Sequence, residues 1–481
     1  MNAPVVPPAS GACFLRRLGL LDAALLCIGG VLGSGIFLTS GYIAESLSSP
    51  LPFLAVWLIG GGITLCGALT FGELGALFPR AGGPYVYIRE AYGLGPAFLY
   101  GWAFFGFIEC GAIAALASGF AECFGSLVPA FSTRTILARA DIAGYAWTLT
   151  PGQLAAVLAI LVLTVVNAVG LRLGLFVQNL LTFTRIGLIL AFILAALIVG
   201  RASGLGDWAG VFSQTSSGWP GFKALGLALM AVFWTYDGWY SVNCAAEEVR
   251  SPGRTIPLSL LIGTSVITAI YLLVNIVYLR ALPIEDMRGV ARIGELAAVR
   301  LFGPDAAAFF AILIMVTILG CLNTTILYGP RVYYAMAKDG VFFPGMCKLD
   351  RRAGVPIKGF AGQAVWAVLL CLSGGFQALY EYVVFALLLF FAATGASVII
   401  LRRKFPGAPR AYRVWGYPLV PLLFIAATLA IFINTLVTQP RKSLLGALLL
   451  AAGWPAYAFW RKRFRPGGKG TGSTARPDPR V

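Results

Sequence analysis

Gly29-Gly30-Val31-Leu32-Gly33-Ser34-Gly35-Ile36-Phe37 lies in the middle of a long apolar run near the start of the chain. Each glycine inside a helix costs about 1 kcal/mol relative to alanine, so this cluster favours an unwound point. Unwound backbone at membrane depth is tolerated only around a cavity or a ligand, because lipid offers no hydrogen-bond partner. The alternative explanation is close helix packing, since small residues are common at helix interfaces in membranes.

An unwound point here would have a defined chemistry. The N–H groups that open the second half-helix, at Ser34, Gly35 and Ile36, would point at one spot. Together with the helix dipole they would form an anion site suited to a carboxylate. The carbonyl groups that end the first half, near Val31, would suit an ammonium group.

The composition of the chain indicates a membrane protein. Hydrophobic residues make up 59% of its 481 residues and charged residues only 11%, whereas an ordinary soluble domain carries about 25% charged residues. A membrane span needs about 20 mostly apolar residues, and the long runs favour helices over strands. The predicted spans are 18–45, 51–78, 94–123, 151–170, 174–200, 220–247, 257–280, 303–330, 357–374, 377–401, 417–438 and 443–460.

The net charge of +17 comes from 36 Lys and Arg residues against 19 Asp and Glu residues. Such an excess could indicate a nucleic-acid partner. With twelve spans and a cytoplasmic N-terminus, however, 25 basic residues fall on the cytoplasmic side and 10 on the outer side. The positive-inside rule therefore explains the charge as topology. We expect a multi-pass protein of the cell (inner) membrane with both termini in the cytoplasm, in contact with membrane lipid and without a nucleic-acid partner.

The absence of histidine limits the chemistry of the chain. It excludes His-based general base catalysis and His metal ligands. The nine cysteines lie mostly in apolar runs, which favours small buried side chains over a disulfide framework. An intramembrane enzyme could use Cys110 or Cys244, but no His is present to activate either thiol. We therefore expect a protein that is not an enzyme and that needs neither a cofactor nor a metal.

A second interruption lies in the helix expected over 220–247, at Phe233-Trp234-Thr235-Tyr236-Asp237-Gly238-Trp239-Tyr240. An Asp at mid-membrane is costly and is by default a functional hypothesis. The alternative is that Asp237 satisfies broken backbone or caps the second half-helix. The two interrupted helices lie five spans apart, a pattern typical of an inverted-repeat transporter with a midplane site.

These positions divide the chain into segments. Residues 18–200 and 220–401 would be the two repeats of five helices each. The other expected segments are a cytoplasmic N-terminus over 1–17, an external loop over 201–219, two added helices over 402–460 and a disordered basic tail over 461–481.

Several ordered motifs resemble the amino acid–polyamine–organocation superfamily. They are Gly33-Ser34-Gly35-Ile36-Phe37, Phe71-Gly72-Glu73-Leu74 and Pro79-Arg80-Ala81-Gly82-Gly83-Pro84-Tyr85. The L-type amino acid transporter branch is indicated by Trp234-Thr235-Tyr236-Asp237-Gly238-Trp239, Glu247-Glu248-Val249-Arg250-Ser251-Pro252, Arg254-Thr255-Ile256-Pro257 and the stretch 331–340. The resemblance covers roughly residues 15–460.

The resemblance implies an all-α membrane protein with the leucine-transporter fold: twelve transmembrane helices, a 5+5 inverted repeat with broken first and sixth helices, and alternating access. It also implies that an amino acid's carboxylate binds at the first break and its amino group at carbonyls of Val31, Trp234 and Asp237. Trp234 aligns with an aromatic gate over the substrate. The expected substrate-binding residues are Val31, Gly33, Ser34, Gly35, Ile36, Trp234, Asp237 and Gly238.

Arg185 is a basic residue inside the span over 174–200. In the resembling family a Lys often stands at this place, where sodium-coupled relatives hold Na⁺, and Thr324 and Thr325 would be the neighbouring hydroxyls. A buried Lys can lose its proton, whereas Arg stays charged. We therefore predict Na⁺-independent transport without proton coupling through Arg185. The alternative is an Arg that snorkels to the membrane surface.

Other carboxylates have expected roles. Glu109, within the span over 94–123, would pair with a cation or hydrogen-bond helix backbone, as a structural support or a coupling residue. Three carboxylates near cytoplasmic ends are expected to form gating ion pairs with nearby arginines: Glu73, Glu247 and Glu248 with Arg80, Arg250 or Arg254.

The expected function is Na⁺-independent exchange or facilitated uptake of neutral or cationic L-amino acids. Asp237 alone does not choose between these substrates. One alternative is a proton-coupled symporter of amino acids or polyamines, in which protons would pass through Glu109 and Asp237. Another is an ion channel, although no selectivity filter can be recognised. Animal relatives pair with a glycoprotein heavy chain through an extracellular Cys, but the loop near Cys123 matches poorly, and we predict no such partner.

Overall fold

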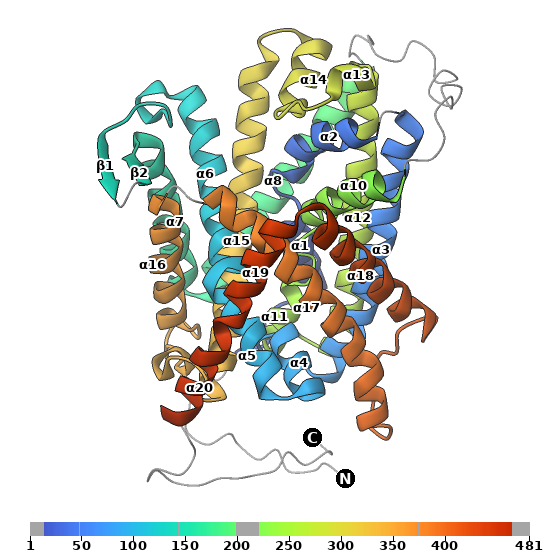
Figure 1. Cartoon of the computed structure of the whole chain (residues 1–481), viewed down its shortest axis with the longest axis vertical. Helices are drawn as coiled ribbons and strands as arrows, with labels where there is room; N and C mark the ends of the chain where they lie inside the picture. The colour runs from blue at the N-terminus through green and yellow to red at the C-terminus, as the bar shows by residue number, and fades with distance from the viewer. Residues whose placement is uncertain (1–13, 48, 143–144, 199–220, 374–375, 464–481) are drawn as a thin grey trace.

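The computed structural model describes residues 14–47, 49–142, 145–198, 221–373 and 376–463. Most helices run along the long axis of one elongated bundle (Figure 1). The N-terminal residues 1–13, the whole of the expected external loop (201–219) and the basic tail from residue 464 lie outside the described residues.

The helices of the first half of the chain are α1 (Leu20–Val31), α2 (Gly35–Ser46), α3 (Pro50–Leu77), α4 (Pro84–Tyr92), α5 (Leu94–Ala103), the π-helical turn η1 (Phe104–Ile108), α6 (Glu109–Leu127), the 3₁₀ turn η2 (Pro129–Phe131), α7 (Pro151–Val169) and α8 (Leu171–Ile198). Those of the second half are α10 (Phe222–Thr235), α11 (Ser241–Cys244), the 3₁₀ turn η3 (Ala246–Glu248), α12 (Pro252–Ala281), α13 (Ile284–Met287), α14 (Ile293–Phe302), α15 (Ala306–Lys338), the 3₁₀ turn η4 (Pro344–Cys347), α16 (Ile357–Ser373), α17 (Phe376–Lys404), α18 (Leu419–Thr438), α19 (Pro440–Ala451) and α20 (Gly453–Arg463).

Each predicted span overlaps one of these helices or a run of two or three consecutive ones. In the described part of the chain, 9 helices are long and apolar enough to cross a membrane, and 10 if α1 and α2 form one bent span. Two further apolar helices, Lys223–Thr235 and Ile357–Ser373, are shorter. The all-α class is therefore confirmed, whereas the count of twelve spans and the inverted repeat stay predictions.

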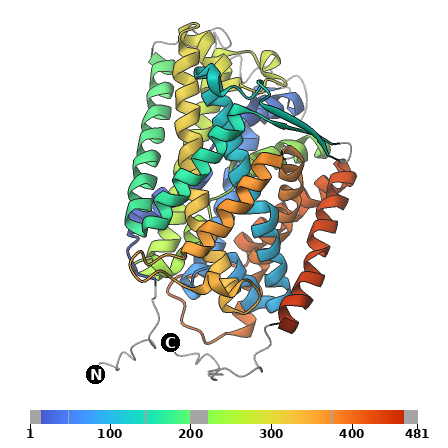
Figure 2. The same ribbon diagram turned by 90° about the vertical axis from the view of Figure 1, so that its left-hand side faces the viewer.

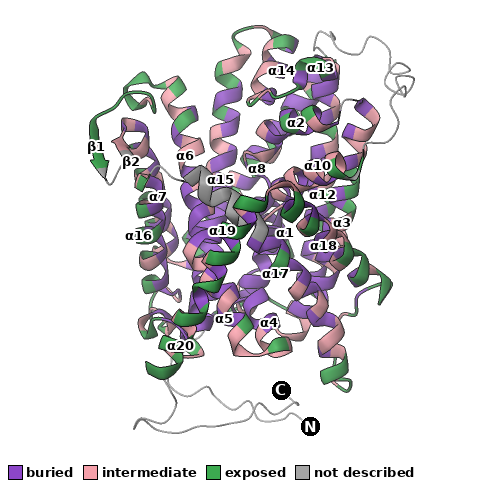
Figure 3. Ribbon diagram, in the orientation of Figure 1, coloured by how far each residue is buried: buried purple, intermediate pink, exposed green. Residues whose placement is uncertain are grey.

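The outer faces of the bundle are apolar. Figure 3 shows exposed residues on the outer turns of the peripheral helices and buried residues along the centre of the molecule. On α7 and α8 the exposed side chains include Leu158, Val162, Val165, Phe176 and Leu194. A continuous apolar exterior of this kind faces lipid rather than water.

A small hairpin occupies part of the segment between α6 and α7, which lies between the spans predicted over 94–123 and 151–170. Strands β1 (Ala138–Ile142) and β2 (Tyr145–Leu149) pair antiparallel, with Ala138 opposite Leu149. The indole nitrogen of Trp147 donates to the carbonyl of Leu372 at 2.7 Å, which attaches the hairpin to the end of α16. The following Thr150 caps α7 through the backbone N–H of Gln153.

The two ends of the described chain lie at the same end of the bundle (Figure 2). Phe14 packs against Tyr334 with ring centroids 5.0 Å apart. Trp460 packs against Phe343, also at 5.0 Å, just beyond the end of α15. At the centre, α12 packs against α1 and α3, and α15 packs against α6 and α8, so that α1 lies inside the bundle.

Candidate functional site

The glycine-rich stretch near the start of the chain is a break in the helix, as predicted. α1 ends at Val31, α2 begins at Gly35, and the two helices are bent by 45°. Among the described residues, no acceptor bonds the backbone N–H groups of Ser34, Gly35 and Ile36. These groups open α2, so unpartnered donors coincide with the positive end of its dipole. The break therefore offers donors for an anion.

The interruption in the second half is also a break, and the two breaks touch. α10 ends at Thr235, and Gly238 follows with φ +94°, a conformation that favours glycine. A Cβ atom on Gly30 would lie 2.4 Å from the carbonyl oxygen of Gly238. In turn, a Cβ atom on Gly238 would lie 2.5 Å from the carbonyl oxygen of Gly30. The glycines thus serve both unwinding and close packing, the two explanations that the sequence left open.

Asp237 and Trp234 flank this contact. The Oδ1 atom of Asp237 is buried and has no hydrogen-bond partner among the described residues. Asp237 does not cap α11, whose N-cap is Tyr240 and which has no side-chain cap. A buried carboxylate oxygen without a donor is costly, so Asp237 offers an acceptor at the second break. Trp234 is half-buried in the last turn of α10 and packs on the main hydrophobic core.

Arg185 binds the first break directly. Its side chain is 0% exposed, and Nη1 donates to the carbonyl oxygen of Leu32 at 2.7 Å. Nη2 donates to the hydroxyl of Thr182 at 2.9 Å, and Nη1 lies 3.4 Å from the carbonyl oxygen of Thr317 on α15. The snorkelling explanation is therefore wrong, because the guanidinium points into the bundle between α1, α8 and α15.

Thr324 lies beside this cation, but its hydroxyl does not form a hydrogen bond with the guanidinium of Arg185. A Cβ atom on Gly29 would lie 2.8 Å from both Nη2 of Arg185 and Oγ1 of Thr324. The hydroxyls of Thr324 and Thr325 each donate to a carbonyl of their own helix. The hydroxyl that contacts Arg185 belongs to Thr182, which the sequence reasoning missed although it lies one turn earlier on the same face of α8.

A chain of buried amides supports Thr182, and the sequence reasoning missed it as well. Gln178 donates to the Thr182 hydroxyl at 3.1 Å and accepts from Asn323 at 2.8 Å. Asn167 then donates to Asn323 at 2.8 Å. All three amides are at most 2% exposed, and they connect α8, α15 and α7. Polar amides inside apolar helices were the available signal, because buried polar groups need partners.

Glu109 is buried, with 1% of its surface exposed, and follows the π-helical turn η1. Its Oε2 accepts a hydrogen bond from the hydroxyl of Tyr328 at 2.9 Å. Its Oε1 is buried without a partner in the described part of the chain. The expectation of a cation or a backbone partner was therefore wrong, since the partner is a phenol on α15. π-helical turns are frequent at functional sites.

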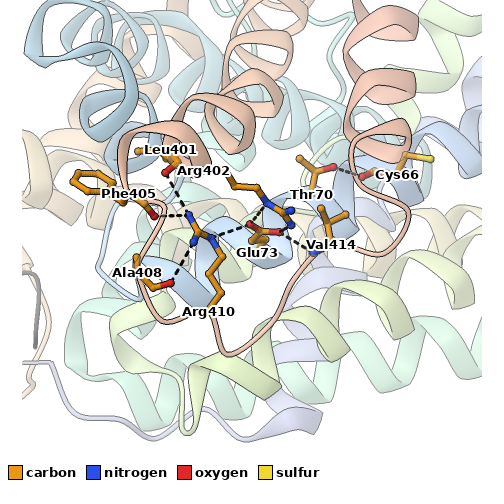
Figure 4. A network of polar contacts seen from close by, with 9 residues as sticks. All are labelled: Cys66, Thr70, Glu73, Leu401, Arg402, Phe405, Ala408, Arg410 and Val414. Atoms are coloured by element: carbon orange, nitrogen blue, oxygen red, sulfur yellow. Dashed lines mark hydrogen bonds and ion pairs between the residues drawn. The ribbon is translucent and has the colours of Figure 1, made fainter.

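Glu73 forms a different ion pair from the one predicted. Figure 4 shows its carboxylate between Arg402 and Arg410, which lie at and beyond the end of α17. Arg402 donates from two nitrogens at 2.8 and 2.6 Å, and Nε of Arg410 lies 3.3 Å away. The backbone N–H of Val414 adds a bond of 2.7 Å. The partners of Glu73 come instead from the end of α17 and the segment after it, where Arg410 and Val414 contact the carboxylate, while Arg80 pairs with Glu90.

Glu248 also has an unexpected partner. It forms an ion pair with Arg331 of α15 at 2.9 Å, and both side chains are 1% exposed. The adjacent Glu247 accepts from the backbone N–H of Ala81 at 3.1 Å. Beside this pair, the N–H of Leu18 donates to the Glu248 carbonyl at 2.9 Å. The segment before α1 is thus bonded to the segment that follows the second break.

Comparisons with known proteins agree with this architecture. A family model described as "Amino acid permease" matches residues 18–454. The serine/threonine exchanger SteT of Bacillus subtilis (strain 168) is 30% identical over 457 residues, which cover 93% of this chain and 97% of that protein. The b(0,+)-type amino acid transporter 1 of Mus musculus is 26% identical, over 88% of this chain and 83% of its own. The human cystine/glutamate transporter is 27% identical, over 94% and 87%.

The family model covers most of the chain, and both helix breaks lie within its limits. The matches cover 97%, 83% and 87% of the three relatives' own lengths. The chain therefore belongs to the amino acid permease family, in the L-type branch of the amino acid–polyamine–organocation superfamily, and is a multi-pass membrane transporter of amino acids rather than an enzyme.

Proposed function

We propose that the protein exchanges neutral and cationic L-amino acids across the cell (inner) membrane without using a Na⁺ gradient. The substrate's carboxylate binds the N–H groups of Ser34, Gly35 and Ile36, and its amino group binds carbonyl groups at the ends of α1 and α10. The N–H donors at the first break and an Asp237 oxygen at the second, none of which has a partner within the described part of the chain, support this orientation. Trp234 acts as the gate over the bound substrate.

The observation that carries Na⁺ independence is the guanidinium of Arg185 on the carbonyl of Leu32. An arginine keeps its positive charge at any physiological pH. A second cation bound beside it would meet strong like-charge repulsion in a low-dielectric interior. The arginine thus supplies permanently the charge that a bound ion would otherwise bring, and it cannot carry a proton across the membrane.

The topology follows from charge. The end of the bundle that holds both described chain ends is the cytoplasmic end, since 25 of the 36 basic residues belong to that side of a twelve-span arrangement. The two repeats over 18–200 and 220–401 then move against each other between outward- and inward-facing states. The chain acts without a heavy-chain partner.

Preloading proteoliposomes with single amino acids tests the exchange mechanism. We expect L-serine and L-lysine inside the vesicles to stimulate uptake of labelled L-serine at least about fivefold over empty vesicles. The reason is that the binding site of an exchanger reorients across the membrane faster with substrate bound than without it. Replacing external Na⁺ by choline will leave the rate unchanged, since Arg185 takes the place of a coupling ion. Uptake that follows a Na⁺ gradient would contradict the proposal, and equal uptake into empty vesicles would indicate uniport.

Asp237→Asn tests the cationic substrates. The change keeps the shape of the side chain and removes its charge, and a hydrogen bond to a charged group is worth about 1.5–3 kcal/mol. We therefore expect kcat/KM for L-lysine to fall at least about tenfold, while the value for L-serine changes less than about threefold. Asp305→Asn, an exposed carboxylate before α15, is the control and should leave both values unchanged. Equal losses for the two substrates would assign Asp237 a structural role instead.

A further inference from the structure

The connection between α17 and α18 carries more positive charge than its surroundings balance. Residues 402–418 include no acidic side chain and five basic ones: Arg402, Arg403, Lys404, Arg410 and Arg413. In the described part of the chain, the only carboxylate that pairs with any of them is that of Glu73, which holds Arg402 and Arg410 (Figure 4). The connection and Glu73 together thus carry a formal charge of +4, five basic residues less one carboxylate.

Arg403 and Arg413 are the two exposed arginines of this connection. Neither side chain has an ion-pair or hydrogen-bond partner among the described residues, whereas Lys404 donates to the backbone carbonyl of Glu90 at 2.8 Å. A guanidinium group has five N–H donors in a planar fork, a geometry that matches two oxygens of a phosphate group. The two arginines therefore offer unused donors and unbalanced charge to an anion.

The two arginines lie next to the residues that anchor the loop. Arg403 follows Arg402, and Arg413 precedes Val414. Arg402 and the backbone N–H of Val414 both bind the carboxylate of Glu73, at 2.6 and 2.7 Å. Two parts of the loop are thus fixed on one carboxylate, and the exposed arginines leave from neighbouring points. A ligand meets them without first ordering the chain, which lowers the cost of binding.

Aromatic and apolar side chains border these arginines. Trp415 is 62% exposed, and the ring of Tyr417 lies against Arg402, with its centroid 3.7 Å from Cζ. Exposed leucines continue from this point along α18: Leu419, Leu422 and Leu423. Trp and Tyr beside basic residues, with an apolar helix beyond them, are typical of the level of the lipid headgroups. The unpaired arginines therefore stand at the edge of the bilayer rather than in open water.

We propose that the α17–α18 connection binds the headgroup of an anionic phospholipid. Arg403 and Arg413 donate to its phosphate, Trp415 packs beside the glycerol, and the acyl chains follow the exposed leucines of α18. A soluble anion would use the arginines but leave the aromatic and apolar border without a role. A zwitterionic headgroup carries its own cation next to the phosphate, so only an anionic one balances the excess charge. The site is independent of which amino acid the protein transports.

A lipid titration of the purified full chain in uncharged detergent tests the site. Dioleoylphosphatidylglycerol should raise the melting temperature of the wild-type protein, because a ligand stabilises the state that it binds. The variant Arg403→Gln/Arg413→Gln should need at least about tenfold more of this lipid for the same rise, since each arginine near an anionic surface changes affinity about fivefold. Without lipid, the variant should melt like the wild-type protein, because exposed side chains without partners contribute little to stability.

Arg288→Gln/Arg300→Gln is the matched control. It removes the same charge from exposed positions after α13 and on α14, at the opposite end of the bundle (Figure 1). The control should respond to phosphatidylglycerol like the wild-type protein. An equal loss in both double variants would reduce the effect to net charge, and an equal rise with dioleoylphosphatidylcholine would mean that headgroup charge is irrelevant. Either result would overturn the assignment, and so would an equal rise with inorganic phosphate at the same concentration, because the occupant would then be a free anion.

Discussion

Gly30→Ala and Gly238→Ala will each reduce amino acid exchange to the background of empty vesicles. A Cβ atom at either position would lie about 2.5 Å or less from a carbonyl oxygen of the opposite break, at 2.4 Å for Gly30 and 2.5 Å for Gly238. The clashing atoms are backbone on both sides, so no side chain can rotate away. Overpacking of this kind costs about 1–3 kcal/mol, and the only relief is to separate the two breaks that form the site.

The measurement is the initial rate of L-serine exchange per mole of reconstituted protein. Purified variants should elute as single peaks in size-exclusion chromatography, as folded proteins do, because the clash is confined to a few residues at the centre of the bundle. Gly62→Ala on α3 is the control, since an added Cβ there meets no atom within 4 Å. It should exchange like the wild-type protein, as alanine also favours the helix. Wild-type rates in both Gly30→Ala and Gly238→Ala would mean that the breaks do not touch during transport.

The breaks could be predicted from sequence because their signals are local. Clustered glycines in an apolar run, and an Asp beside a Gly at mid-membrane, mark costly positions without reference to any distant residue. The same reasoning singled out Arg185, because a buried charge is expensive wherever its partners lie. What it could not supply was the acceptor, the carbonyl of Leu32, which is 153 positions away along the chain.

The ion pairs were mispredicted for the same reason. Glu73 was assigned to arginines near it in sequence, yet its partner Arg402 is 329 positions away. Which helix ends meet at this end of the bundle is decided by tertiary packing, and opposite charges near such an end have many possible partners. The hairpin before α7 was not predicted, because its two strands are only five residues long each and lie between much longer apolar runs.

Glu248→Gln will destabilise the protein far more than the loss of a carboxylate from an exposed ion pair. Glu248 and Arg331 are each 1% exposed, and two guanidinium nitrogens contact the carboxylate at 2.9 and 3.2 Å. Arg331 also lies over the rings of Phe14 and Phe360, so it cannot reach water. Removing one partner of a buried pair leaves an uncompensated charge and costs about 3–5 kcal/mol. The melting temperature in detergent should fall accordingly.

Glu295→Gln provides the comparison, because its carboxylate pairs with Arg292 at 3.3 Å in a partly exposed position. Such pairs contribute about 0–1 kcal/mol, so the melting temperature should barely change. The double variant Glu248→Leu/Arg331→Met should recover most of the loss of Glu248→Gln, since apolar residues can replace a buried pair without leaving a charge. If Glu248→Gln and Glu295→Gln had the same small effect, water would have to reach Arg331, and this end of the bundle would be open rather than sealed.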